Sequence, residues 1–486
     1  MNPPTLTRRG LLQGGSMALA AAAASPADAQ STPAADSRIT STLATFMAEA
    51  ASHPLPEPVV EKTKYMVLDT LAAMISGSQL PPGRFALHFA RECGGDKVAT
   101  VVASNVVCGP IEAALCNGIL AHSDETDDTH SPSQSHPACS IVPAALATGE
   151  RFGIDGARLL RAVALGYDIG PRVTITLGRL QYMSATHHST HGISGTFGSC
   201  AAAGCAAGLN AQQMRWLLSY AAQQASGLAS WQRDLEHIEK AFDFGGMPAR
   251  NGVTAALLVH AGANAVDDIF SGADNFFQAF VPRNDASMVI DGLGQRYEII
   301  RTNIKKWTIG APIQAPMDCL YNLMQREHFT ADQVKHITVR GATHEASIVN
   351  NREIPDICLQ HLLSLMLVDR KITFQSVHDK ARMQDPAILK QRAKIELIGD
   401  DELEKLIPQR VGIMDLTLTD GRVLHERVGA VRGTNENPMT REEVVAKAKD
   451  LIVPVLGEAT CNKLVATVFD LEHVKDVREL RPLLQH

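Results

Sequence analysis

The sequence has few aromatic residues, no excess of basic charge and none of the common nucleotide-binding or serine-hydrolase motifs. Only 5% of its 486 residues are aromatic, and its formal net charge at pH 7 is -7. A mildly acidic chain of this kind is a poor candidate for binding nucleic acid or an anionic membrane surface. A Walker loop, a Gly-x-Gly-x-x-Gly after a strand pattern and a Gly-x-Ser-x-Gly elbow are all missing, so the sequence supports neither a nucleotide cofactor nor a serine hydrolase.

Long apolar runs and paired cysteine motifs are also missing. No stretch of about 18 continuous apolar residues follows the N-terminal region, so we expect no membrane segment in the mature chain. The nine cysteines are scattered in mostly apolar contexts, and none forms a Cys-x-x-Cys pair. This pattern favours buried thiols, and the odd count leaves at least one of them free. Whether others pair in an oxidising compartment stays open.

The N-terminus has the three parts of a twin-arginine export signal. Arg8 and Arg9 precede an apolar stretch from Met17 to Ala24, and Ala27-Asp28-Ala29 provides a small-residue cleavage site. We therefore predict a signal peptide at residues 1–29, cleaved near Ala29, and a flexible leader at residues 30–37. The mature protein is expected in the periplasm.

Residues 38–300 have sequence patterns that are typical of helices. Val60, Lys64, Val67, Leu71 and Ile75 follow a helical spacing that Gly77 would end. Residues 198–208 are almost wholly Ala, Cys and Gly, a composition that permits helices to approach closely. Residues 210–213 resemble a capping box.

Residues 301–434 have sequence patterns that are typical of strands as well as helices. Residues 336–340 alternate like a strand, and two alternating runs at 413–418 and 423–428 flank an Asp-Gly pair, the strongest short signal for a hairpin. Residues 359–368 read as a helix, and a capping box at 440–443 begins two further helices in residues 435–486. The predicted fold class is therefore mainly α: a large all-helical domain, with a smaller α+β domain inserted before the C-terminal helices.

The most unusual segment runs from His122 to His136 and holds four carboxylates and three histidines. Adjacent like charges repel one another, so this density is hard to explain as a solvated surface. The segment also lies between two apolar runs, which predicts a polar loop that joins two buried helices and presents catalytic groups. Carboxylates beside histidines suit proton transfer near neutral pH. The carboxylates are Asp124, Glu125, Asp127 and Asp128.

Three further clusters contain groups suited to an anionic substrate. Residues 187–198 place three histidines just ahead of the small-residue helix, where backbone amides favour anions. Residues 231–252 supply cations near glycines, and residues 305–316 supply two lysines near the predicted domain junction. Each of these clusters taken alone also fits a solvated turn or a surface ion pair.

Taken together and in this order, the four clusters resemble those of the MmgE/PrpD family, which includes 2-methylcitrate dehydratases, cis-aconitate decarboxylases and related epimerases. The resemblance extends from about Ser37 to the C-terminus. Residues 121–130, Ala-His-Ser-Asp-Glu-Thr-Asp-Asp-Thr-His, are similar to the family's His-x-x-Asp-Phe-Asp-Asp-Thr-His signature. Agreement continues in Ser-His-Pro at 135–137, Met-Pro-Ala-Arg-Asn-Gly at 247–252 and Asn-Pro-Met at 437–439.

The resemblance implies a helical domain capped by an α+β lid, a homodimer, a small di- or tricarboxylate substrate and no cofactor. It places the family's acid, threonine, histidine before proline, second histidine and lysine on Glu125, Thr129, His136, His188 and Lys240. We expect His136 and His188 to transfer protons, Lys240 to hold carboxylates, and Glu125 and Asp128 to support the histidines. The further substrate-binding candidates are Asp127, His130, Arg233, Lys306 and Gln314.

Two residues depart from the family pattern. Glu125 replaces the usual aspartate, and Gln314 stands where many members have a histidine. Glutamine forms hydrogen bonds but cannot accept and return a proton near neutral pH, so its presence points to a changed division of acid–base work or to a different reaction.

The expected activity is a lyase that moves a proton next to a carboxylate and so eliminates water or carbon dioxide. Three alternatives remain: a cofactor-free carboxylate isomerase or epimerase, a metal-dependent hydrolase, and a periplasmic carboxylate-binding protein. The acidic run contains ligand types that suit zinc, manganese or calcium. Yet Glu125, Asp127 and Asp128 are too close in sequence to face one point from a regular helix, and no metal ligand is assigned.

Overall fold

The computed structural model describes residues 38–281 and 285–486, and this part of the chain is mostly helical with a small sheet. The predicted signal peptide and leader lie outside the described residues. The longer helices are α1 (Arg38–Glu49), α2 (Glu57–Gly77), α3 (Pro81–Cys93), α4 (Pro110–Ala121), α5 (Ala138–Phe152), α6 (Gly156–Leu177), α7 (Arg179–Thr186), α8 (Thr190–Ala207), α9 (Ala211–Gln224), α11 (Met247–His260), α13 (Gln314–Arg326), α15 (Leu359–Asp369) and α19 (Arg441–Phe469). The short helices are α10 (Ile238–Ala241), α12 (Phe276–Phe280), α14 (Thr343–Val349), α16 (Phe374–His378), α17 (Pro386–Arg392), α18 (Asp401–Glu404) and α20 (Arg481–Leu484). The strands are β1 (Ala99–Thr100), β2 (Val107–Cys108), β3 (Val334–Ala342), β4 (Ile395–Asp400), β5 (Gly412–Leu418) and β6 (Val423–Val428).

Helix α8 lies at the centre of the first hydrophobic core and packs against α5, α6 and α11. Its small residues permit this packing. A Cβ atom on Gly198 would lie 2.7 Å from a methyl group of Ile141 on α5, and one on Gly252 of α11 would lie 2.4 Å from the backbone of Ser199. Both distances are shorter than real Cβ contacts, so the helices approach as closely as the composition predicts.

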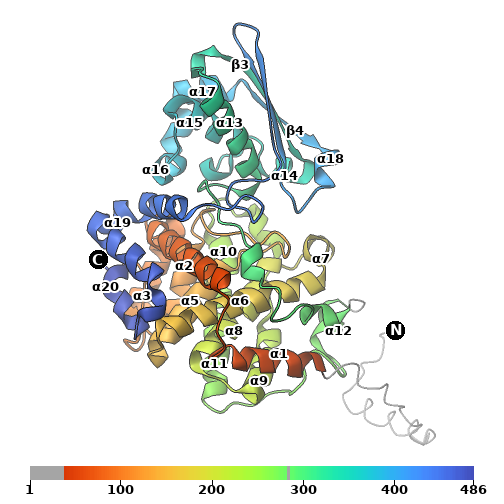
Figure 1. The fold of residues 1–486 in the computed structure, drawn as a ribbon, viewed down its shortest axis with the longest axis vertical. Coiled ribbons are helices and arrows are strands. Elements are labelled where there is room, and N and C mark those ends of the chain that lie inside the picture. Colours follow the sequence, from red (N-terminus) through yellow and green to blue (C-terminus); the bar gives the residue numbers. More distant parts are fainter. Residues whose placement is uncertain (1–37, 282–284) are drawn as a thin grey trace, which may run out of the picture. The chain divides into compact units, whose positions relative to one another are not determined.

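A second hydrophobic core is built around the four-stranded sheet, whose strand order is β4-β3-β5-β6. Strand β3 pairs in parallel with β4 and antiparallel with β5, and β5 pairs antiparallel with β6. Helices α13 and α15 pack beside the sheet (Figure 1). The predicted hairpin is confirmed: β5 and β6 are joined through Gly421, whose φ of 93° is one that glycine adopts without strain.

Helix α19 returns the chain to the first core. Thr440 and Glu443 form the predicted capping box, and the buried side chains of Leu451 and Leu464 join that core. Helix α19 is the one described helix that is long and apolar enough, by length and composition, to cross a membrane. Its Lys447 ammonium forms a buried ion pair with Asp69 of α2 at 2.7 Å, so the structure uses α19 as a packed helix of the first core.

All nine cysteines lie within the described residues and are free thiols. Eight are buried and only Cys93 is exposed. This agrees with the expectation of buried thiols in apolar surroundings.

Candidate active site

The segment His122–His136 is the predicted polar loop, and it joins α4 to α5. Every residue from His122 to His130 is buried. The backbone of Thr129 exchanges two hydrogen bonds with Asn303, at 3.1 and 2.9 Å. The loop is therefore held from both its ends and its middle, which fixes the side chains that it carries.

Close backbone contact positions one more element beside this loop. A Cβ atom on Gly118 of α4 would lie 2.4 Å from the carbonyl oxygen of Gly245, so only glycine fits there. Gly245 belongs to a single turn of π-helix at Phe242–Gly246. Such turns commonly occur at functional sites. Here the turn places the Phe244 ring against the histidines of the loop.

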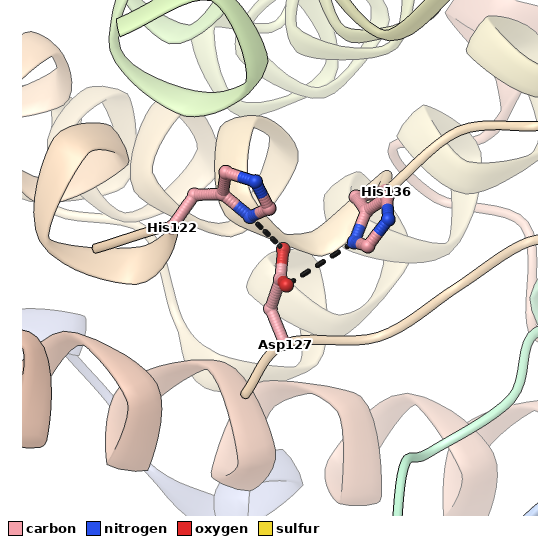
Figure 2. A group of neighbouring side chains, drawn as sticks. All are labelled: His122, Asp127 and His136. Carbon is pink, nitrogen blue, oxygen red and sulfur yellow. Dashed lines mark hydrogen bonds and ion pairs between the residues drawn. The ribbon is translucent and has the colours of Figure 1, made fainter. Parts of the chain in front are cut away.

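Asp127 lies between two imidazoles (Figure 2). One carboxylate oxygen lies 2.9 Å from Nδ1 of His122, and the other lies 3.1 Å from Nδ1 of His136. Burial by itself would raise the pKa of Asp127, but the two histidines outweigh burial and hold the pKa well below its ordinary value. Asp127 is thus a carboxylate that orients both rings, with Nδ1 of each ring facing it and Nε2 facing away.

Burial lowers the pKa values of three histidines near this carboxylate: His136, His191 and His237. It lowers the pKa of His136 to about 4 although Asp127 opposes the shift. Burial, together with neighbouring positive groups, also holds the pKa values of His191 and His237 well below the ordinary value. Neutral imidazoles at pH 7 can accept protons.

The Phe244 ring organises these histidines into one cluster. His191 stacks on it with ring centroids 3.7 Å apart, and His122 stacks on it at 4.4 Å. His237 lies 5.0 Å from His122. Within the described part of the chain, no partner bonds Nε2 of His122, Nδ1 of His191 or Nε2 of His237. These three ring nitrogens therefore have unused hydrogen-bonding capacity at the buried cluster.

Two lysines converge on Glu125. Its side chain forms an ion pair with Lys240, and Lys305 Nζ lies 2.8 Å from its backbone oxygen and 3.5 Å from a carboxylate oxygen. The Lys240 ammonium also lies 5.3 Å from the Trp231 ring centre and 5.2 Å from that of Phe244. Burial alone would raise the pKa of Glu125, but Lys240 and Lys305 outweigh it and hold the pKa well below its ordinary value.

The next two predicted residues have different surroundings. Asp128 accepts hydrogen bonds from the Tyr167 hydroxyl at 2.7 Å and the Ala138 amide at 3.2 Å. Burial, reinforced by Asp127, raises the pKa of Asp128 well above its ordinary value. Asp128 does not line the cavity that opens onto this cluster, so its role is to hold the surrounding helices in place. Thr129 does line that cavity, and its buried hydroxyl has no partner among the described residues.

A cavity of about 330 Å³ opens onto the cluster. Both parts of the chain contribute to its walls: Glu125, His136 and Lys240 come from the helical part, and Arg352 and Arg410 from the α+β part. A second cavity of about 440 Å³ adjoins it and shares Thr129, Ala311 and Arg410 with it. The first cavity has the dimensions expected for a small ligand.

The structure does not bring His188 or Arg233 into this cavity. The His188 Nδ1 atom lies 2.6 Å from the Tyr182 hydroxyl, and its ring lies near Phe280. His188 precedes α8, whereas His191 lies in its first turn and points to the cluster. Arg233 is exposed at the surface. The histidine that this segment supplies to the site is His191.

Three other predicted binding residues have structural partners. His130 lies between Ser133 at 2.7 Å and Glu298 at 3.1 Å, away from the cavity. The Lys306 ammonium lies 4.0 Å from the Tyr321 ring centre, within the α+β part. The Gln314 amide bonds the backbone of Trp307 and Ile309, with its nitrogen 2.8 and 3.0 Å from their oxygens. The Gln314 side chain therefore fixes the conformation of the backbone at Trp307 and Ile309. None of the three residues lines the first cavity.

Four residues of the cluster were not among the predicted catalytic or binding residues: His122, His191, His237 and Lys305. A signal for His191 was present in the sequence: Ser189 is a residue type that caps helices, and in the structure it caps α8 and places His191 in the first turn. No comparable signal separates Lys305 from Lys306. Lys305 is buried against Glu125, whereas the neighbouring lysine faces the other way.

Two groups of described residues have the spacing of metal ligands: His122, Asp127 and His136, and His122, Glu125 and His237. The donor types suit zinc or manganese. However, the ammonium of Lys305 lies 3.5 Å from Glu125 and 3.8 Å from Asp127, and Lys240 also pairs with Glu125. A divalent cation would have to displace or repel these positive charges. The donor set therefore fits the lysines better than a metal ion.

The sequence matches known proteins over nearly its whole length. Residues 41–289 match the MmgE/PrpD N-terminal domain, and residues 307–471 match the MmgE/PrpD C-terminal domain. A cis-aconitate decarboxylase from Aspergillus terreus is 25% identical over 93% of this chain and 96% of its own length. The human cis-aconitate decarboxylase is 25% identical over 92% of this chain and 94% of its own length.

Proposed function

Because the chain belongs to the MmgE/PrpD family, we propose that its cavity catalyses the loss of carbon dioxide or water from a di- or tricarboxylate. The chain is an enzyme of the lyase class, as its decarboxylase relatives are. The observation that carries the proposal is the Asp127 carboxylate, which orients the imidazoles of His122 and His136 beside two lysines. This arrangement supplies a proton acceptor and positive charge in one buried place.

His136 is the proposed proton-transfer residue. Its Nδ1 faces Asp127, so its Nε2 lies on the opposite edge of a ring that lines the cavity. In a dehydration, Nε2 takes a proton from the carbon next to a carboxylate while the hydroxyl group on the neighbouring carbon leaves as hydroxide, which a solvent proton converts to water. In a decarboxylation, the carbon–carbon bond breaks, carbon dioxide leaves, and the electrons of the bond form an enolate with the remaining carboxylate. A proton from the solvent, passed on through Nε2 of His136, then reaches the carbon.

The lysines stabilise the negative charge that develops in either reaction. Lys240 lies at the cavity wall, and Lys305 lies behind it against Glu125 and Asp127. Charge on the enolate oxygens grows in the transition state, so a fixed ammonium group lowers the barrier. The unbonded Thr129 hydroxyl and the His191 ring complete the polar wall around the reacting end.

The test is proton NMR of the purified protein in D2O with a panel of hydroxy and unsaturated di- and tricarboxylates. The proposal expects vinyl signals to appear or disappear with the wild type and not with His136→Ala. His425→Ala, an exposed histidine of the hairpin, is the matched control and should retain activity. Deuterium exchange without net conversion would indicate an isomerase or epimerase instead. Activity that a chelator removes would indicate the metal-dependent hydrolase.

Three further properties are proposed from the sequence. The N-terminal segment directs export to the periplasm, the α+β part acts as a lid, and the chain forms a homodimer. Replacement of Arg8 and Arg9 by lysines should retain the protein in the cytoplasm in a cell fractionation experiment.

Light scattering of the purified protein measures the mass of the assembly, and a monomeric mass would overturn the dimer.

A further inference from the structure

Nearly all the positive charges around the first cavity already have acidic partners. Lys240 pairs with Glu125, Lys305 lies close to Glu125 and Asp127, and Arg410 pairs with Glu345 at 2.7 Å. Each of these cations therefore already has a carboxylate partner within the protein.

Arg352 is the exception among the cations that line the cavity in the described part of the chain. It follows α14, is half-buried, and its guanidinium has no ion pair or hydrogen bond to any described residue. Arginine offers five donors in a planar fork that matches a carboxylate. An arginine that faces a cavity without a partner is a binding group for an anion.

Much of the remaining wall is apolar. Leu180 and Met183 of α7 face the cavity from the helical part, and Ile348, Ile354 and Ile357 face it from the α+β part. Ile348 is 40% exposed, so the described residues leave much of its side chain without a partner. A ligand that covers this surface gains free energy from apolar burial.

Given the lyase activity proposed above, we infer that the substrate is a dicarboxylate with a sizeable apolar substituent. One carboxylate lies at the reacting end near Lys240, Arg352 binds the other, and the apolar group covers Ile348 and its neighbours. A tricarboxylate fits less well, since its third carboxylate would be desolvated against apolar side chains, and the remaining cation of the wall, Arg410, is held by Glu345.

The test compares cis-aconitate with 2-benzylmaleate. Both are maleates with one substituent on the double bond, and they differ in a third carboxylate versus a phenyl group. Trp231 lines the cavity, so quenching of tryptophan fluorescence reports binding without turnover. We expect 2-benzylmaleate to bind at least about tenfold more tightly than cis-aconitate. Tighter binding of cis-aconitate, or binding of neither compound, would overturn the inference.

Arg352→Met provides the second arm. It should weaken binding of 2-benzylmaleate by about tenfold or more, and leave binding of the monocarboxylate 2-benzylacrylate unchanged. The matched control is Arg427→Met, an exposed arginine of β6 outside the cavity, which should change neither affinity. Equal affinity of wild type and Arg352→Met for the dicarboxylate would remove Arg352 from the site.

Turnover in the same samples separates this inference from the proposed reaction. Efficient conversion of cis-aconitate together with its tighter binding would leave the lyase standing and overturn the inferred substrate class. Binding of 2-benzylmaleate as expected, without conversion of any carboxylate in the NMR panel, would leave the ligand class standing and overturn the lyase.

Discussion

The most informative single substitution is Asp127→Asn. In the wild type, the two oxygens of Asp127 lie 2.9 and 3.1 Å from Nδ1 of His122 and His136, and both rings are buried. An asparagine has one oxygen to accept an N–H and one amide nitrogen that can only donate. At most one histidine keeps its Nδ1–H tautomer, and the other must move its proton to Nε2, the atom that faces away from residue 127.

The expected loss is large because no carboxylate then holds the proton of His136 on Nδ1, and in the other tautomer its Nε2 cannot accept a proton. Removal of a general base typically lowers kcat by about 10²–10⁴-fold, or about 3–5 kcal/mol. The assay is kcat and KM with a carboxylate that the NMR panel identifies, together with ¹⁵N spectra of histidine-labelled protein that report each tautomer. A kcat for Asp127→Asn within a few-fold of the wild type would refute the assigned role of Asp127.

Asp128→Asn is the matched control. The same substitution is made at the adjacent buried position, where burial raises the pKa and the carboxyl bonds Tyr167 and the Ala138 amide. The variant loses at most one of these two hydrogen bonds, which costs about 1 kcal/mol of stability. Its kcat should stay near that of the wild type. An equal loss of activity in both variants would mean that Asp127→Asn lowers activity by disturbing the fold and not by changing the tautomers of the histidines.

Three further outcomes follow from the site. His191→Ala should lower kcat strongly, by about 10²-fold or more, whereas His188→Ala should change it little because that ring lies outside the cavity; the reverse order would contradict the placement. Lys240→Met should lower kcat/KM by about 10²-fold, since it removes charge at the cavity wall, and steady-state kinetics check this. The ion pair of His378 with Asp124, at 3.0 Å, raises the pKa of His378 from 6.5 to about 9 against the effect of burial. Its stabilisation is full below pH 6.5 and is lost as the pH rises through about 9, so denaturant unfolding of His378→Gln should lack that part of the pH dependence.

Local patterns predict the elements that depend on neighbours in the sequence. The helical spacing from Val60 to Ile75 corresponds to α2, which ends at Gly77 as expected. The capping boxes at Asn210 and Thr440 are both present, because a cap needs only a polar side chain and the amide three residues on. By contrast, β4 was not predicted. Its short run pairs with β3, which is about sixty residues earlier in the chain, and tertiary contacts decide such pairings.

The charge density of the sequence marks the segment from His122 to His136 as part of the site. It does not show which other polar residues are buried beside that segment. Glu125 and His136 belong to the acidic segment that charge density marks, whereas Lys240 was named only through the family resemblance; all three line the cavity. The choice between His188 and His191 depends on where α8 begins. The Gln314 amide donates to the backbone oxygen of Trp307, a contact that forms only in the folded chain. A sequence does not show which of several neighbouring polar residues turns inward.

The proposed role of His136 is tested most directly by following one proton. A carboxylate that the protein converts is incubated in D2O with the wild type, and proton and carbon NMR locate deuterium in the substrate and product. A decarboxylation should place solvent deuterium on the carbon next to a carboxylate in the product, whereas a dehydration should release the proton of that carbon to the solvent. His136→Ala should abolish net conversion in either case. A decarboxylation product without deuterium at that carbon, or full activity in His136→Ala, would contradict proton transfer by the Asp127-oriented imidazole.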